Sequence, residues 1–210
     1  MNTSNKHFIN FGTAKTASSW LYNNLMTSPA IDYQGIKEPG LHIARNLESY
    51  NKYFENSQFS LNFNVSSWRL DSNQINQISS RATHKSIIFR NPYTYANSLY
   101  NFWQLHNWDS DNFLDSFIQF FDYANIIKRL PADILILYYD DIKNSPQYTM
   151  NQITDYLEID TIAISENYVN VTNYQKNLTF DPKYIMLLNN FIDTFQDSVK
   201  KNLSHWKMDV

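Results

Sequence analysis

Short apolar runs alternate with longer amphipathic segments along most of the chain. The runs predict strands at residues 7–11, 32–36, 59–63, 85–89 and 133–139. Apolar residues at helical spacing predict helices at 17–27, 72–80, 93–106, 111–130, 146–157 and 182–203. Parallel strands need crossover connections, so this alternation favours a central parallel sheet flanked by helices on both faces. We therefore expect an α/β fold.

The length and composition are those of a globular protein. The chain has 210 residues, of which 43% are hydrophobic and 16% aromatic, and this is enough apolar material for a buried core. We expect a single domain over residues 1–210. The polar segment 158–180 is predicted to be irregular and to contribute a loop over a bound ligand.

The first predicted strand leads into a segment with the chemistry of an anion site. Gly12 follows the strand, Lys15 comes shortly after it, and hydroxyl residues open the next helix. Amide groups at a helix N-terminus point at a bound anion, and the helix dipole favours negative charge there. The lysine adds a cation, and the hydroxyls add hydrogen-bond donors. The predicted site comprises Gly12, Thr13, Ala14, Lys15, Thr16, Ala17, Ser18 and Ser19.

This segment differs from the phosphate loop of nucleoside triphosphate enzymes, which has the pattern G-x-x-x-x-G-K-[ST]. No Gly-Lys pair followed by Ser or Thr occurs anywhere in the chain. A nucleoside kinase is therefore disfavoured.

A second strand–turn–helix segment has complementary chemistry. The run 85–89 ends in Arg90-Asn91-Pro92, and a proline suits the first turn of the following helix. Arg90 comes at the carboxyl end of a strand, where open α/β sheets bind their ligands. Ser98 lies about two turns into the helix. Its hydroxyl and the Arg90 guanidinium can converge on one phosphate group.

Together the two segments resemble the sulfotransferase family. The Gly12–Leu21 segment is similar to that family's loop for the 5′-phosphosulfate of 3′-phosphoadenosine-5′-phosphosulfate (PAPS). Arg90 and Ser98 are similar to its 3′-phosphate site. The resemblance implies the P-loop-like sulfotransferase fold and transfer of a sulfuryl group from PAPS to a hydroxyl. It implies no metal, and the sequence offers no ligand cluster for one.

A third element resembles the carbohydrate-type members of the family. Lys37-Glu38-Pro39 follows the predicted strand 32–36, and in those members the corresponding Glu is the proposed general base. The resemblance thus implies Lys15 and Glu38 as catalytic residues. His42 is the alternative base, because an imidazole titrates near neutral pH whereas a carboxylate needs a raised pKa. The choice between Glu38 and His42 stays open at this point.

The later part of the chain resembles the family more loosely. Residues 134–142 are similar to its late strand ending in an acidic pair, and residues 145–157 to the helix that follows. No Arg-Lys-Gly loop is present near the C-terminus, so Tyr174 and Lys176 are the candidates for covering the nucleotide. Residues 63–68 lack the charged, proline-containing element of many carbohydrate-type members.

The acceptor is expected to be a hydroxyl on a carbohydrate. Tyr100, Trp103 and Trp108 follow the second anion segment and could stack on sugar rings, although core packing accounts for them equally well. The altered element at 63–68 motivates a second hypothesis, in which the chain is a non-catalytic nucleotide- or glycan-binding protein that retains the fold.

The net charge and the cysteine content limit the kinds of partner and metal site that the chain can have. The net charge of −3 gives no reason to expect a nucleic-acid surface, and the absence of cysteine excludes disulfides and thiolate metal sites. No signal peptide or membrane span is evident near the start of the sequence. We expect a soluble cytoplasmic protein without a membrane partner, of bacterial or viral origin, in the latter case acting in the infected host cell.

Overall fold

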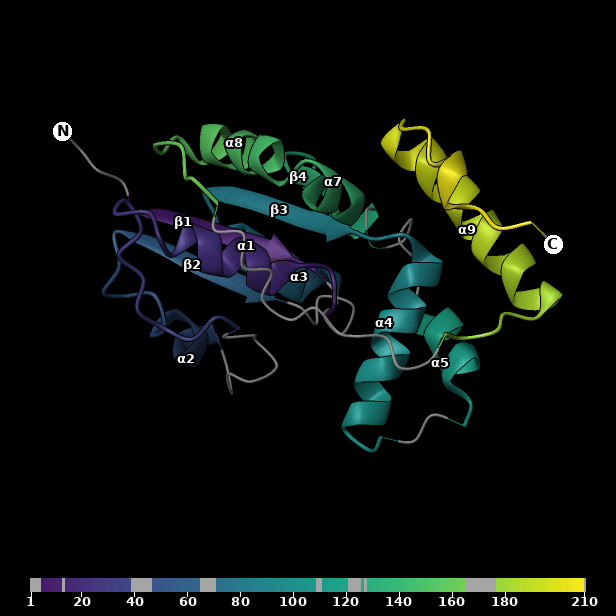
Figure 1. Ribbon diagram of the computed structural model, residues 1–210. Helices are drawn as coiled ribbons and strands as arrows, with labels where there is room; N and C mark the ends of the chain where they lie inside the picture. Colours follow the sequence, from purple (N-terminus) through teal and green to yellow (C-terminus); the bar gives the residue numbers. More distant parts are fainter. Residues whose placement is uncertain are drawn as a thin grey trace. The chain divides into compact units, whose positions relative to one another are not determined.

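A four-stranded parallel sheet forms the centre of the structure. The computed structural model describes residues 5–12, 14–38, 47–64, 71–108, 111–120, 126, 128–164 and 177–209. The strands are β1 (Lys6–Phe11), β2 (Phe59–Asn64), β3 (His84–Phe89) and β4 (Leu135–Tyr138). All neighbouring strands are parallel, in the order β2-β1-β3-β4 (Figure 1). The predicted α/β fold with a central parallel sheet flanked by helices is confirmed.

Helices occupy the connections between the strands and the C-terminal part of the chain. They are α1 (Ser18–Leu25), α2 (Leu47–Asn51), α3 (Ser72–Ser79), α4 (Pro92–Leu105), α5 (Phe113–Phe120), α7 (Tyr139–Asn144), α8 (Pro146–Leu157), α9 (Pro182–Val199) and the 3₁₀ helix η2 (Ser204–Trp206). Five of the six predicted helices appear close to their predicted bounds. The sixth, expected at 111–130, is observed as α5, and several residues after it lie outside the described ranges.

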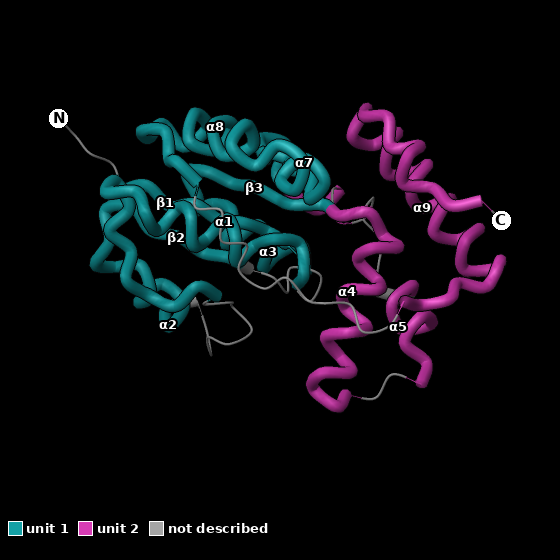
Figure 2. The backbone as a smooth tube through the Cα atoms, viewed as in Figure 1, with its two compact units in different colours: residues 1–89, 131–170 teal, residues 90–130, 171–210 magenta. Residues whose placement is uncertain are grey.

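The chain divides into two compact units, which Figure 2 shows in different colours. Unit 1 comprises residues 1–89 and 131–170, and it contains the whole sheet. Unit 2 comprises residues 90–130 and 171–210, and its described elements are helical. The sequence reasoning expected one domain over residues 1–210, and that expectation stays a prediction.

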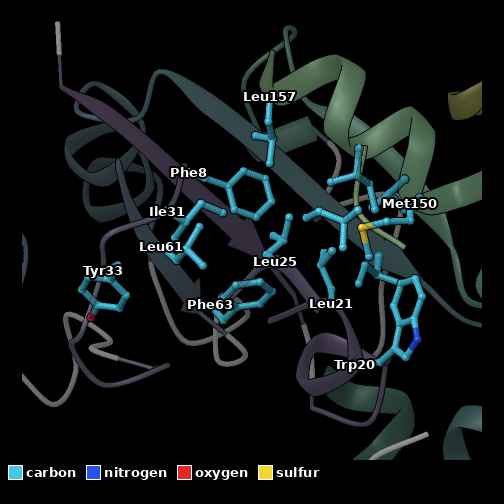
Figure 3. Close-up of a cluster of buried hydrophobic side chains, with 14 of the residues drawn as sticks. Phe8, Trp20, Leu21, Leu25, Ile31, Tyr33, Leu61, Phe63, Met150 and Leu157 are labelled. Atoms are coloured by element: carbon cyan, nitrogen blue, oxygen red, sulfur yellow. The ribbon is translucent and has the colours of Figure 1, made fainter. Parts of the chain in front are cut away.

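The core of unit 1 lies between one face of the sheet and two helices. Strand side chains alternate between faces, and the pairing of Phe8 with Leu61 and of Ile88 with Leu137 places these four residues on the same face. All four are buried. They belong to one cluster with apolar residues of α1 and α8, among them Trp20, Leu21, Leu25, Met150 and Leu157 (Figure 3).

Other elements of unit 1 lie on the opposite face of the sheet. Crossovers between parallel strands are right-handed, and β1→β2 runs in the opposite direction across the sheet from β2→β3. Helix α3 must therefore lie on the other face from α1. Asp71 and Gln74 begin α3 with a capping box. From α2, the Tyr50 hydroxyl accepts a hydrogen bond from the Asn62 side chain, which projects from this second face.

The strand order also defines where a ligand can bind. The chain passes from β1 outward to β2 and then returns to β3 on the other side of β1. The neighbouring strands β1 and β3 thus form the switch point of the sheet, where open α/β proteins bind ligands beyond the carboxyl ends of the strands. Gly12 follows β1 directly, and Arg90 follows β3 directly. The two predicted anion segments begin at the two strands of this pair.

The strand predicted at 32–36 is absent, and that prediction is wrong. Residues 31–38 are irregular and are fastened to the edge strand β2 at two points. The Asp32 carboxylate accepts hydrogen bonds of 2.8 Å from the backbone N–H groups of Gln58 and Phe59, and the Lys37 carbonyl accepts one of 3.0 Å from Phe63. A side chain thus takes the place of backbone pairing at one end, so no regular ladder forms.

Strand β4 is shorter than the resemblance of residues 134–142 to the family's late strand suggested. β4 ends at Tyr138, and residues 139–144 form helix α7. The acidic pair Asp140-Asp141 lies in the first turn of this helix, where negative charge is favoured by the helix dipole. The acidic pair therefore begins a helix instead of ending a strand.

Unit 2 is built around α4 and α9. The Tyr93 hydroxyl of α4 donates hydrogen bonds to the Ile185 carbonyl and to Asn189 of α9, and burial raises the pKa of Tyr93 to about 12. Trp206 is buried and stacks on Phe195. These contacts join the start of α4 to the C-terminal helices.

A buried histidine on β1 predicts how stability depends on pH. The His7 ring is hydrogen-bonded to the Ser60 hydroxyl and packs edge-on against Phe54. Burial, with a smaller contribution from the Arg81 charge, lowers the pKa of His7 to about 4. The unfolded chain takes up this proton near pH 6.5, so the stability present above pH 6.5 is lost as the pH falls towards 4.

We expect this loss to be as large as roughly 3 kcal/mol, since each pKa unit corresponds to about 1.4 kcal/mol. Urea unfolding at pH 7 and at pH 4 measures it, and His7→Gln, which cannot titrate, should lose much less stability over the same range. Equal losses in the two proteins would show that other groups cause the acid sensitivity.

Candidate functional site

The loop between β1 and α1 has an unusual backbone. Lys15 and Ala17 both adopt left-handed conformations, with φ of 66° and 70°. Gly12 does not have a positive φ, but a Cβ there would lie 3.2 Å from the Asn10 side-chain oxygen and 3.8 Å from the Thr16 hydroxyl. A Cβ at position 12 would therefore lie tightly against the Asn10 side chain, while the turn itself is made at Lys15 and Ala17.

Ala17 immediately precedes α1 and is not helical, although the helix was predicted to begin at residue 17. It is the N-cap, and it forms no side-chain hydrogen bond to the helix. The first amide groups of a helix have no partner within the helix. Without a capping side chain at Ala17, the amide groups of this N-terminus are suited to an anion.

The left-handed alanine predicts a stabilising substitution. An L-residue with a side chain pays roughly 1–2 kcal/mol for this conformation, and glycine does not. Ala17→Gly should therefore raise the free energy of unfolding by up to about 1 kcal/mol, because the greater conformational freedom of glycine in the unfolded chain offsets part of the gain. Thermal unfolding checks this. Ala14→Gly, at a position without positive φ, is the control and should not stabilise; a gain at both positions would contradict the explanation.

The loop residues differ in exposure. Thr16 and Ser18 are buried, whereas Ala14, Lys15 and Ser19 are partly exposed. Thr13 lies outside the described residues. The predicted loop therefore exists as a connected strand–turn–helix, with Ser18 and Ser19 as the first two residues of α1.

A second lysine reaches this helix N-terminus from the edge segment. The Lys37 ammonium donates to the Ser19 hydroxyl at 3.0 Å, to the Ser18 hydroxyl at 3.2 Å and to the Glu38 carboxylate at 2.7 Å. Its side chain is only 21% exposed. The structure thus brings Glu38 to the α1 N-terminus through Lys37.

Two contacts hold Lys37 in this place. Its carbonyl is bound to the Phe63 amide at the end of β2, and its ammonium lies 6.0 Å from the centre of the Phe63 ring. The backbone is thereby fixed to the sheet, and the charged end lies over an aromatic face, which favours a cation. The other candidate base, His42, lies outside the described residues.

Arg90 and its helix form the second predicted anion segment, which belongs to unit 2. Asn91 caps α4 by accepting hydrogen bonds from the amides of Tyr93 and Thr94, and Pro92 occupies the first turn. The Arg90 side chain is buried, with 4% of the residue exposed, and its Nε donates to the Thr94 hydroxyl at 3.2 Å. A short capped turn thus fixes the guanidinium.

Ser98 lies on α4 one turn after Thr94, as predicted, and it is buried. Its neighbour Asn97 accepts a 2.6 Å hydrogen bond from the Leu178 amide. Lys176 lies outside the described residues, but Leu178, two positions later, is thereby fastened to the turn of α4 that carries Ser98. The end of the segment predicted to cover the nucleotide therefore contacts this helix.

The aromatic residues after this segment separate into two kinds. Tyr100 and Trp103 are partly buried and pack edge-on against Phe113. Trp108 is 53% exposed, and its ring contacts Phe102 and Trp103. Core packing thus explains the first two, and Trp108 is the candidate for stacking on a ligand.

Among the described residues, no group of three or more His, Asp or Glu side chains is arranged to hold a metal ion. No helix in the described ranges is both long and apolar enough to cross a bilayer.

Sequence reasoning missed two residues of these segments. Thr94 follows Arg90 by one helical turn, and this spacing was a signal that could have found it. Lys37 was noted only as the neighbour of Glu38. Nothing in the spacing shows that its ammonium reaches Ser18 and Ser19, because the contact joins segments of different secondary structure.

Comparison with known proteins shows the family to which the chain belongs. Residues 6–190 match the sulfotransferase domain family, and this range runs through both compact units. No curated protein matches the chain.

Solved structures show the same fold at low sequence identity. A sulfotransferase from Alicyclobacillus acidocaldarius superposes with a TM-score of 0.69 at 15% identity, covering 96% of this chain and 98% of that one. The mouse sulfotransferase SULT7A1, complexed with PAP, gives a TM-score of 0.60 at 13% identity, covering 97% and 87%. The sulfotransferase domain of the curacin biosynthetic pathway gives 0.52 at 12% identity, covering 87% and 77%.

Proposed function

Because this chain belongs to the sulfotransferase domain family, we propose that it transfers a sulfuryl group from PAPS to an acceptor hydroxyl. The observation that carries the proposal is the pair of segments after the switch-point strands. One offers an uncapped helix N-terminus with a lysine, and the other offers a buried arginine beside a hydroxyl. The mouse relative solved with PAP supports a donor of this type.

The roles follow from the chemistry of sulfuryl transfer. The bond between sulfur and the donor phosphate oxygen breaks as the acceptor oxygen bonds to sulfur, and negative charge develops on the leaving phosphate. Lys15 and the α1 N-terminus stabilise this charge. Glu38 takes the proton of the acceptor hydroxyl, with His42 as the alternative base. Arg90 and Ser98 bind the 3′-phosphate, and Lys176 covers the nucleotide.

A carbohydrate is the acceptor class that we propose. The exposed Trp108 supports it, since its ring is held by neighbouring aromatics and presents an apolar surface with a polar edge.

The test is a thermal-shift titration with 3′-phosphoadenosine-5′-phosphate (PAP), followed by transfer of labelled sulfate from PAPS to a panel of glycans and small alcohols. We expect a concentration-dependent rise in melting temperature and labelling of at least one glycan. Binding without transfer would instead favour the non-catalytic hypothesis, and the absence of both would refute the proposal.

Arg90→Ala should weaken binding selectively for nucleotides that carry a 3′-phosphate. Loss of a charge-assisted contact costs roughly 1.5–3 kcal/mol, so the affinity for PAP should fall about 10- to 150-fold. Binding of adenosine 5′-phosphate by the same variant is the control, because it is insensitive to the missing contact. Calorimetry measures both affinities, and equal losses would mean that Arg90 acts only through stability.

A further inference from the structure

The Lys37 ammonium has three protein acceptors within hydrogen-bond distance. They are the hydroxyls of Ser18 and Ser19, at 3.2 and 3.0 Å, and the Glu38 carboxylate, at 2.7 Å. An ammonium has three N–H groups and no acceptor. These three contacts therefore account for its whole hydrogen-bonding capacity.

The direction of these bonds determines what the two serines can do. Each hydroxyl accepts from Lys37 with an oxygen lone pair, so its own O–H must point elsewhere. A hydroxyl that accepts from a cation is polarised, which makes it a stronger donor. Both serines lie in the first turn of α1, where the helix amides favour an anion. The lysine thus prepares two hydroxyl donors at the place where a phosphosulfate would bind.

We propose that Lys37 is a positioning residue that acts through Ser18, Ser19 and Glu38 without contacting the nucleotide itself. It directs two hydroxyls towards the 5′-phosphosulfate and holds the base carboxylate beside them. The inference rests on the proposed function and deepens it, because it connects the donor site and the base in one hydrogen-bonded cluster.

The surroundings of Lys37 favour a fixed role of this kind. Its backbone is bound to Phe63, its side chain is mostly buried, and five residues earlier Asp32 binds the start of β2 through two amides. The Gln58 and Phe59 amides lower the pKa of Asp32, so this anchor remains ionised at neutral pH. A lysine held at both ends of its segment can orient its neighbours at little entropic cost.

The experiment is a double-mutant cycle on PAP affinity. The proteins are the natural chain, Lys37→Met, the pair Ser18→Ala with Ser19→Ala, and the combination of all three. We expect Lys37→Met and the serine pair each to raise the Kd about tenfold. If Lys37 acts through the serines, the combined variant should be no more than about threefold weaker than the serine pair.

Two controls separate this role from a structural one. Lys37→Arg, which retains a charged donor, should keep the Kd within about threefold of the natural chain. Lys52→Ala removes a lysine of another surface, paired with Glu48, and should change nothing. Melting temperatures of all variants report folding, and the Arg variant keeps the test decisive if the Met variant does not fold.

Each outcome decides the question. Strong coupling with rescue by Arg supports the proposal. Multiplying effects overturn it, since Lys37 would then act independently of the two serines, and an unchanged Kd in Lys37→Met overturns it as well. If the natural chain does not bind PAP, the proposed function is refuted. If it binds PAP but the variants show no coupling, only the role assigned to Lys37 is refuted.

Discussion

Replacing Lys15 with alanine should lower sulfuryl transfer by about 10²–10³-fold while weakening PAP binding much less. A cation aimed at the leaving phosphate oxygen matters most when charge has developed there, so its loss falls on the transition state. The substitution should not change the conformational strain of the backbone at this position. Lys15 is left-handed, and alanine and lysine both carry a Cβ, so they pay the same conformational cost.

Single-turnover transfer of labelled sulfate, together with calorimetric binding of PAP, separates these two effects. Lys15→Arg keeps the charge and should retain more activity than Lys15→Ala. Near-normal turnover of the alanine variant would show that this loop does not bind the reacting end of the donor.

Replacing Glu38 with glutamine should lower turnover by about 10²–10⁴-fold with little change in PAP affinity, because Gln cannot accept the acceptor proton. The carboxylate is partly exposed and lies 2.7 Å from the Lys37 ammonium, and a glutamine oxygen can accept the same hydrogen bond. The shape of the site is therefore kept while the basic group is removed.

Turnover is the measurement, and His42→Asn is the matched control. If Glu38 is the base, turnover should fall in Glu38→Gln and persist in His42→Asn. The reverse pattern would assign the base to His42. If both variants retained turnover, neither Glu38 nor His42 would be the base that takes the proton of the acceptor hydroxyl.

The strands and helices that were predicted correctly are those whose sequence patterns lie within a few neighbouring residues. β1 and β3 are short segments that carry several apolar residues and are buried along nearly their whole length, and α4 begins with an Asn cap followed by Pro. Each of these signals acts within a few residues and does not depend on distant partners. The prediction of a strand at 32–36 was wrong for the opposite reason. A strand forms only if another strand pairs with its backbone, and here the Asp32 side chain binds the amides in place of the backbone.

The candidate site residues were chosen from their types and spacing, and they stay a prediction. The Gly12 and Arg90 segments were found because their residue types and spacing suit anions. The left-handed Ala17 could not be found, as alanine carries no sign of that conformation. The contact between Lys37 and the first turn of α1 depends on where the segment beside β2 lies, and this is a tertiary property.

That segment also covers part of an edge of the sheet. β2 is an edge of the sheet, and an unprotected edge invites pairing with another molecule. The amides of Gln58, Phe59 and Phe63 are already engaged by Asp32 and by the Lys37 carbonyl. Any change that releases residues 31–38 would therefore displace Lys37 and Glu38 and also expose an edge prone to aggregation, so that inactivity and low solubility would arise from one event.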